Sequence, residues 1–327
     1  MDELKQLVDD IGRRSYDAQF GKRRLPEVFD ADLWHTLDES GLTRLITEQD
    51  AGPRELAVVL AGLARHAAAV PIAETDLLAG WLAAEAGLEV PAGPLTVGIG
   101  AGGVARDVPW PTDAAIVLAA READGLYVGL LHDPEVTAGH NLAGEPRGAL
   151  EYDTDGLTGL DPAVGDELVR RGAWARCVQI IGAFDAALEL TVAHTSERVQ
   201  FGRALSKFQA VQHSLAAMAG EIEQARAATD LATAAVTDYG FGHARADYAV
   251  TVAKVAVGRA VTPVTTIAHQ LHGAIGVTIE HQLWSATMRA RSWSDEFGST
   301  AGYARRLGRW ALQAEDPWDV LISSPTS

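Results

Sequence analysis

The feature that most constrains the fold is a set of three long apolar stripes in the second half of the chain, from Pro162 onward. In each stripe apolar residues recur every three or four positions, the spacing that places side chains on one face of an α-helix. The third segment is apolar on a second face as well, so it must be buried on more than one side. Together with a shorter helical region over Arg289 to Gln313, the stripes predict an antiparallel four-helix bundle, part of whose surface covers another subunit. The stripes are Cys177, Ile181, Phe184 and Leu188, then Val211, Leu215, Met218, Ile222, Ala225 and Ala232, then Val250, Ala253, Val257, Val261 and Val264, with Tyr248, Val252 and Val255 on the second face.

The rest of the chain divides into a helical zone and a β-rich zone. Helical periodicity over residues 1–87 predicts four helices, with Gly41 placed where one would end and Pro71 between the last two. Short β-type runs separated by turn pairs such as Asp124-Gly125 follow over residues 88–161. We therefore expect a mainly α protein with a small β middle domain: an N-terminal helical domain (1–87), a reduced β domain (88–161) and a C-terminal four-helix bundle (162–327). The β-type runs are Leu95–Ile99, Ala114–Ala119, Leu126–Leu131 and Ala149–Tyr152.

Composition narrows the classes of partner and the cellular compartment. The 327 residues include 44 acidic and 27 basic ones, a net charge of −17. Because phosphate backbones are bound by clustered Lys and Arg, this balance predicts that nucleic acid is not a partner. The single cysteine, Cys177, rules out a disulfide within the chain and is typical of a reducing compartment. The apolar run Leu56–Ala64 is too short to span a bilayer and Met1–Phe20 is charged throughout, so we expect a cytoplasmic protein with no membrane partner.

One glycine pattern resembles a phosphate-binding motif, but the sequence around it cannot form the helix that the motif requires. Gly98, Gly100 and Gly103 fit the spacing G-x-G-x-x-G, whose function requires a helix that begins at the glycines. Pro109 and Pro111 follow closely and forbid a helix of any length there. We interpret the match as chance. The sequence also contains no metal-ligand spacing and no Gly-x-Ser-x-Gly nucleophile elbow.

The most informative stretch runs from Ser196 to Arg203 and continues with Phe208 to His213. It connects the first bundle helix to the second, and Gly202 is expected to break the helix. It presents Arg198, Arg203 and Gln209 at one end of the bundle. The arginines could donate forked hydrogen bonds to a phosphate, and Phe201 offers an aromatic face to a flat ring. The plainer alternative is a polar connection with solvated arginines.

A second informative stretch runs from His269 to His281, at the end of the third bundle helix. Gly273 is placed to end that helix, which by itself describes an ordinary C-cap. The small residues after it would also let a ligand approach the backbone, with Gln270 and His272 as donors. Both interpretations remain open from these residues alone.

The two stretches together resemble the C-terminal domain of the acyl-CoA dehydrogenase family. The segment from Arg198 to Gly202, followed by Phe208 to Gln212, is similar to the family's R-x-x-F-G and F-Q-x-x-Q segments, and Gln270 to Gly276 is similar to its Q-x-x-G-G-x-G turn. The resemblance covers residues 165–310, and over the first 160 residues it consists of the zoning alone.

The resemblance implies a flavoenzyme whose FAD is bound across a subunit interface. By motif position, Arg198 and Phe201 would contact the diphosphate and adenine side of the flavin, with Gln209 nearby and Gln270 and Gly273 approaching from the turn. The implied reaction is α,β-desaturation of an acyl-CoA thioester, in which a carboxylate removes the α-proton and the β-hydrogen leaves as hydride. An electron acceptor such as an electron-transfer flavoprotein would reoxidise the cofactor.

The chain departs from the family pattern where the catalytic base is expected. Counting from Arg289 puts Gly298 at the base position, with Glu296 only close to it, and the alternative base position falls near Gly172. A Thr-Glu-Pro-x-x-Gly-Ser flavin loop is also missing from the β zone. These departures resemble the short subunit of actinobacterial heteromeric (α2β2) acyl-CoA dehydrogenases, several of which act on steroid side-chain CoA thioesters.

Three hypotheses follow from the resemblance and the departures. The first is a subunit that lends flavin contacts to a longer homologous partner, which supplies the base. The second is a self-sufficient homomeric dehydrogenase that uses Glu296 as its base. The third is a catalytically silent subunit that stabilises its partner.

Overall fold

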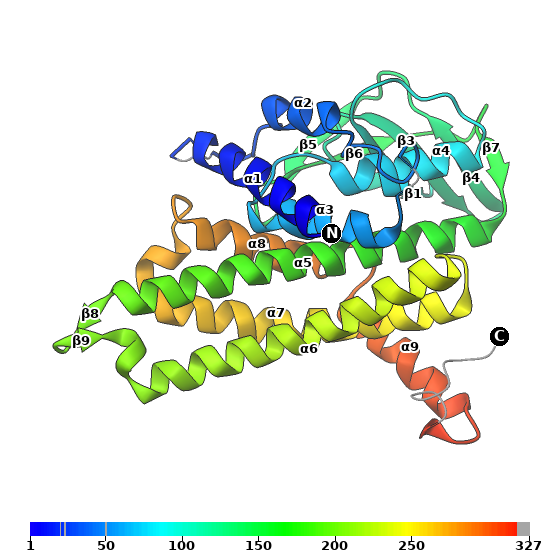
Figure 1. The fold of residues 1–327 in the computed structure, drawn as a ribbon. Coiled ribbons are helices and arrows are strands. Elements are labelled where there is room, and N and C mark those ends of the chain that lie inside the picture. The colour runs from blue at the N-terminus through cyan, green and yellow to red at the C-terminus, as the bar shows by residue number, and fades with distance from the viewer. Residues whose placement is uncertain (20, 23, 50, 319–327) are drawn as a thin grey trace. The chain divides into compact units, whose positions relative to one another are not determined.

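The structure is a computed structural model that describes residues 1–19, 21–22, 24–49 and 51–318. Helices, strands and again helices follow one another along the chain, as the sequence predicts (Figure 1). The last nine residues of the expected bundle range 162–327 lie outside the described residues. The first helical zone contains α1 (Asp2–Gln19), α2 (Ala31–Glu39), α3 (Pro53–Arg65), the π-helix η1 (Glu74–Gly80) and α4 (Trp81–Glu85).

By their internal contacts, the residues form two compact units. One unit contains residues 1–21, 57–67 and 173–327, and the other contains residues 22–56 and 68–172. Helix α1 and most of α3 belong to the unit of the bundle, and the division into domains 1–87, 88–161 and 162–327 stays a prediction. A close approach between helices explains the grouping: a Cβ on Gly182 of α5 would lie 2.0 Å from the carbonyl oxygen of Ala61 in α3.

The sheet of the second unit is mixed and has the strand order β5-β6-β2-β1-β3-β4-β7. Strands β1 and β3 are parallel, and all other neighbours are antiparallel. One side is filled by apolar residues that include Val108, Ile116, Leu118 and Leu150. Four strands match the predicted runs, whereas β2, β5 and β7 were not predicted. The strands are β1 (Leu95–Ala101), β2 (Val104–Pro109), β3 (Ala115–Glu122), β4 (Gly125–Leu130), β5 (Val136–His140), β6 (Pro146–Glu151) and β7 (Thr158–Leu160).

The glycine pattern lies in the hairpin of β1 and β2, so the exclusion of a helix that begins at these glycines is confirmed. Gly102 and Gly103 have positive φ angles and form the turn between β1 and β2. A Cβ on Gly100 would lie 2.2 Å from a ring carbon of Tyr152, so this glycine makes room for an aromatic side chain. The Tyr152 hydroxyl donates to Glu122 at 2.7 Å. The glycines therefore serve packing and turn formation.

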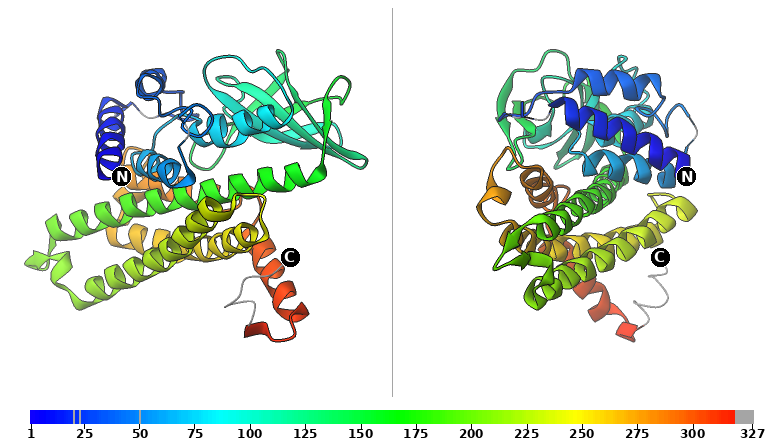
Figure 2. Two further views of the ribbon diagram at one scale, coloured as in Figure 1. Left: turned by 45° about the vertical axis from the view of Figure 1, so that its right-hand side comes forward. Right: turned by 60° about the vertical axis from the view of Figure 1, so that its left-hand side comes forward.

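The predicted bundle is present and consists of long helices that run side by side in Figures 1 and 2. The residues expected on the stripes are largely buried, among them Cys177, Phe184, Ile222 and Val257. The region Arg289 to Gln313 was predicted as one helical region, but it is divided between two helices by the turn 294–299, where Phe297 and Gly298 have positive φ angles. The helices are α5 (Pro162–Glu197), α6 (Gln209–Tyr239), α7 (Ala244–His272), α8 (Gln282–Trp293) and α9 (Thr300–Gln313), with the 3₁₀ segments η2 (Leu205–Lys207) and η3 (Gly273–Val277).

Two of these helices are long and apolar enough to cross a membrane by length and composition. They are Pro162–Glu197 and Ala244–Val277, and the protein itself buries 61% and 50% of their most apolar windows. Core helices of a bundle have the same property, because they are apolar on more than one face.

Candidate functional site

The connection between α5 and α6 forms a tight β-hairpin at one end of the bundle. Helix α5 ends at Glu197, and β8 (Val199–Gln200) pairs with β9 (Arg203–Ala204). The two tip residues, Phe201 and Gly202, have φ angles of 52° and 78°. Positive φ at both central residues is the conformation of a type I′ hairpin turn. The helix ends at Glu197, before the predicted position at Gly202, and Gly202 instead forms the tip of the hairpin.

Phe201 is exposed to solvent, and its backbone has a positive φ angle, which is unfavourable for a residue other than glycine. Its side chain is 91% exposed, although it contacts Phe208 edge-to-face with ring centroids 6.2 Å apart. A non-glycine residue with positive φ costs roughly 1–3 kcal/mol and persists where the surrounding structure fixes it. A strained, exposed aromatic side chain at a hairpin tip is typical of a residue that contacts another molecule.

Two arginines flank this tip and present their guanidinium groups to solvent. Arg198 follows the last residue of α5, and Arg203 stacks its guanidinium over the Phe208 ring at 4.1 Å from the ring centroid. In the part of the chain that the structure describes, neither arginine makes an ion pair. Gln209, the first residue of α6, is exposed beside them.

The second predicted stretch lies at the same end of the bundle. Gly273 ends α7 with φ 68°, and its backbone N–H donates to the carbonyl oxygen of His269, so the predicted C-cap is confirmed. No atom lies within 4 Å of a Cβ built on Gly273. Gln270 is exposed on the last turn of α7. The rings of His194 in α5 and His272 in α7 stack with centroids 4.5 Å apart, which brings the two stretches together.

The side chains at this end of the bundle are suited to bind a ligand that contains both a phosphate and a flat aromatic ring. Two guanidinium groups can each donate paired hydrogen bonds to phosphate oxygens. The side-chain amides of Gln209 and Gln270 add donors, and Gly273 leaves its backbone approachable. Because these groups face outward, a ligand held by them would also contact whatever molecule packs against this end.

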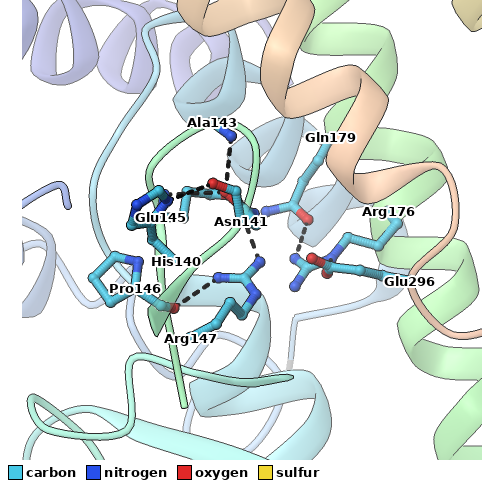
Figure 3. Close-up of polar contacts among 9 residues, drawn as sticks. All are labelled: His140, Asn141, Ala143, Glu145, Pro146, Arg147, Arg176, Gln179 and Glu296. Carbon is cyan, nitrogen blue, oxygen red and sulfur yellow. Dashed lines mark hydrogen bonds and ion pairs between the residues drawn. The ribbon is translucent and has the colours of Figure 1, made fainter. Parts of the chain in front are cut away.

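Glu296, the base in the homomeric hypothesis, lies in the turn between α8 and α9 and forms an ion pair with Arg176. The Nε–H of Arg176 donates to Glu296 Oε2 at 2.6 Å, and Nη1–H of the same side chain donates to Gln179 Oε1 at 2.6 Å (Figure 3). The Arg176 side chain is 2% exposed and that of Glu296 is 21% exposed. Oε2 of this carboxylate therefore has a structural role in holding Arg176.

A buried lysine fixes the main chain of the same turn. Lys254 of α7 is 1% exposed, and its Nζ donates to the carbonyl oxygens of Ser294 at 2.8 Å and Glu296 at 2.7 Å. Burial lowers the pKa of Lys254, and the neighbouring Cys177 and Glu296 act in the opposite direction. The hydroxyl of Tyr303 donates to the carbonyl oxygen of Phe297 at 3.0 Å. The turn is therefore held from α5, α7 and α9.

The structure does not bring Glu296 to the arginine and glutamine groups at the bundle end. Arg176, which contacts Glu296, precedes Arg198 by 22 positions in the sequence. At a rise of 1.5 Å per residue, this separates the two positions by roughly 33 Å along α5. The expected cofactor residues and the expected base thus belong to two separate places on the bundle.

Several residues at these places were missed by sequence reasoning. Arg176, Gln179 and Lys254 lie within apolar helical stripes, where a single polar residue is hard to assign. A charged residue on an otherwise apolar helix face could have indicated a buried polar contact, because charges are rarely buried unless they are paired. Their partners could not be found, since the Arg176–Glu296 contact joins residues 120 positions apart.

The β-containing unit has its own buried ion pair. Glu145 and Arg147, each 5% exposed, form an ion pair at 3.5 Å (Figure 3). Asn141 donates to Glu145 at 2.7 Å and accepts from the backbone N–H groups of Ala143 and Glu145. These contacts shape the turn between β5 and β6, and they show no feature that selects a ligand. In the ranges 1–19, 21–22, 24–49 and 51–318, no group of three or more His, Cys, Asp or Glu side chains is arranged to hold a metal ion.

Comparison with known proteins places the bundle in a family. Residues 166–311 match the family model of the acyl-CoA dehydrogenase C-terminal domain. The chain is 31% identical to acyl-CoA dehydrogenase IpdE2 of Mycolicibacterium smegmatis over 155 residues, which are 46% of this chain and 46% of that protein. The chain thus spans less than half the length of the curated relatives that it matches.

Solved structures share the fold of nearly the whole chain. A chain of the ChsE4–ChsE5 complex of Mycobacterium tuberculosis superposes with a TM-score of 0.80 at 23% identity, over 99% of this chain and 98% of that one. A chain of Tcur3481–Tcur3483, a steroid acyl-CoA dehydrogenase, superposes with a TM-score of 0.78 at 25% identity, over 95% and 98% of the two chains. The predicted resemblance and the predicted fold class are confirmed.

Proposed function

We propose that this chain, which belongs to the acyl-CoA dehydrogenase family by its C-terminal domain, is one subunit of a heteromeric, FAD-dependent acyl-CoA dehydrogenase. Members of this family are FAD-dependent flavoproteins. In the proposed assembly, a longer homologous subunit supplies the catalytic base and the remaining flavin contacts. This chain contributes the exposed end of its bundle to a flavin held at the subunit junction.

One contrast within the bundle supports the proposal. The side chains suited to a dinucleotide are exposed at the bundle end, where Arg198 and Arg203 make no ion pair among the described residues, whereas Glu296, the acid nearest the expected base position, is paired with Arg176. A subunit that lends cofactor contacts without a base of its own would have this distribution.

The residues of this chain would act by binding and orienting. Arg198 and Arg203 would neutralise the diphosphate of FAD, Phe201 would cover a flat ring face, and Gln270 would donate from the end of α7. When bound, FAD supplies the capacity to accept a hydride from the β-carbon of an acyl-CoA thioester. The residues of this chain would hold the cofactor still, so that its reacting edge meets the substrate in a fixed orientation.

The substrate class extends this proposal. Two solved chains with the same fold come from the ChsE4–ChsE5 complex and from a steroid acyl-CoA dehydrogenase, and the latter is 25% identical to this chain. We extend the proposal to a CoA thioester of a steroid side chain, with an electron-transfer flavoprotein as the acceptor.

The proposal is tested by expressing the chain with and without a longer homologue encoded beside it. We expect the lone chain to purify with little bound flavin, and the co-purified complex to show flavin absorbance and acyl-CoA-dependent reduction of a dye. A lone chain with a full complement of FAD and dehydrogenase activity would refute partner dependence. A complex that binds the homologue but no flavin would favour the silent stabilising subunit.

The variant Glu296→Gln separates the partner-dependent enzyme from a homomeric one that uses Glu296. We expect the complex to keep its turnover within about twofold, while its thermal stability falls, because buried Arg176 loses a charged acceptor at a cost of roughly 1–3 kcal/mol. A general base contributes about 10²–10⁴-fold to a rate, so a loss of that size would identify Glu296 as the base. Asp295→Asn, at the exposed neighbouring acid, is the matched control.

A further inference from the structure

A cluster of histidine side chains joins three helices at the bundle end. The rings of His194 and His272 stack at 4.5 Å with an interplanar angle of 21°, and His281 meets His272 edge-on at 5.1 Å. His194 belongs to α5, His272 ends α7, and His281 is the N-cap of α8. The three rings, which we call the imidazole stack, therefore tie together elements that are far apart in the sequence.

The surroundings of the ring nitrogens assign a neutral form to His272 and His281. His272 Nδ1 lies 2.9 Å from the carbonyl oxygen of Ala268, which can only accept, so this nitrogen carries the hydrogen. His272 Nε2 is buried and has no hydrogen-bond partner among the described residues. His281 Nδ1 accepts the backbone N–H of Leu283 at 3.1 Å, so a proton there would break the cap of α8.

The surroundings of the stack oppose a positive charge. Burial, with smaller contributions from the neighbouring His194, His281 and His269, lowers the pKa of His272 to about 4, against the opposite effect of its hydrogen bond to the carbonyl oxygen of Ala268. The pKa of His194 is lowered by burial and by Arg198, against a weaker opposite effect of Glu197. Burial also lowers the pKa of His281 and the pKa of His269. The positive charge of Arg291, on α8, lowers the pKa of His269 as well.

The stack lies directly behind the proposed cofactor contacts. His272 stands between Gln270 and Gly273, and His194 precedes Arg198 by four residues, about one helical turn. A Cβ on Gly276 would lie 2.7 Å from the Cβ of His272, so the turn η3 packs closely on this histidine. Any movement of His272 would displace both the turn and its contact with α5.

We propose that His272 is a positioning residue whose uncharged ring, stacked between His194 and His281, holds Gln270 and Arg198 in place, and that protonation of the stack in mild acid releases this end of the bundle and its cofactor. The cofactor part of this inference rests on the proposed function, whereas the acid sensitivity of the bundle end does not.

The direction of the pH effect follows from linkage. Between the ordinary histidine pKa of 6.5 and the lowered value of about 4, the unfolded chain binds more protons at this site than the folded chain. Acid therefore favours unfolding in this interval. From pH 7.5 to 5.5 His272 alone should raise the unfolded-to-folded ratio by about tenfold. The two pH values, 7.5 and 5.5, lie above the pI near 4.9, at which the chain carries no net charge.

The first experiment compares the thermal midpoints of the lone chain and of His272→Phe at pH 7.5 and 5.5. Phenylalanine keeps an aromatic ring in the stack but cannot be protonated. We expect the wild type to lose roughly 2 °C more than the variant on acidification. His132→Phe, at an exposed histidine in the other compact unit, should keep the wild-type loss. An equal loss in His272→Phe and wild type would overturn the inference.

The second experiment uses the complex with its partner and measures the FAD retained after gel filtration at both pH values. We expect wild type to retain less FAD at pH 5.5 than at pH 7.5 and His272→Phe to retain the same amount at both values. Equal retention by wild type at both values would overturn the inference, whereas a complex without FAD at pH 7.5 would refute the proposed function and leave the thermal experiment decisive. If His272→Phe does not fold, ¹³C-histidine NMR of the wild type decides, because a His272 ring that titrates near 6.5 contradicts the inference.

Discussion

Replacement of Lys254 by methionine should lower the free energy of unfolding by roughly 2–4 kcal/mol. The ammonium group is buried and donates to two main-chain carbonyls of the turn 294–298. Methionine has a similar length but no donor, so both carbonyl oxygens lose a partner, at roughly 1–3 kcal/mol each. Part of this cost is offset because methionine does not have to be desolvated as a cation.

Chemical denaturation of the lone chain measures this effect, and amide hydrogen exchange locates it. We expect faster exchange over residues 294–299, with little change in the hairpin β8–β9. Lys207→Met, at an exposed lysine in η2, is the matched control and should change stability by less than about 0.5 kcal/mol. A Lys254→Met chain as stable as this control would show that the turn is held by Arg176 and Tyr303 alone.

The rigidity of this turn bears on catalysis. A catalytic base in a desaturation must meet the α-proton of the substrate, so its carboxylate has to be accessible. Arg176 and Gln179 instead form a connected polar group around Glu296, and Lys254 fixes the backbone that carries it. These contacts indicate that the turn has a structural role, because they fix the connection between α8 and α9.

The bundle could be predicted from the sequence because its signal is local and repeated. Residues such as Ile222 and Val257 recur at helical spacing over many turns, and the structure buries them. The hairpin stretch was equally visible, because Gly202 and Phe201 lie next to each other and their roles depend on the chain nearby. Local patterns of this kind need no knowledge of distant partners.

The sheet was only half predicted, for identifiable reasons. Strand β2 contains Arg106 and Asp107 and ends at Pro109, so its composition suggests a loop. Strand β5 is an edge strand with little burial, so it lacks the apolar alternation that marks a strand. Both strands are stabilised by pairing with β6, a contact that their own residues do not encode.

The compact units and the polar contacts depend on residues distant in the sequence. Gly182 is one of several glycines in a helix, and only the approach of Ala61 shows why it is small. The imidazole stack joins residues that are 78 positions apart, and each of its histidines alone is an ordinary helix-end residue. Such pairs become visible only when the helices are packed.

Arg198→Ala should weaken FAD binding by the complex by roughly 10–100-fold, because a charge-assisted hydrogen bond to phosphate contributes about 1.5–3 kcal/mol. Arg198 makes no ion pair among the described residues, so the fold should lose little stability. Fluorescence titration of the flavin-depleted complex with FAD measures the affinity, and thermal unfolding of the same sample tests the fold.

Two further variants make the result specific. Arg198→Lys keeps the charge but loses the forked donor, so it should restore only part of the affinity. Arg245→Ala is the control, because Arg245 lies near the start of α7, at the opposite end from Gln270, and is occupied by Tyr239, to which it donates at 2.7 Å. If Arg198→Ala binds FAD as tightly as this control, the arginines of the hairpin are merely solvated. The exposed and strained Phe201 would then have to be explained by contact with a protein surface instead of a cofactor.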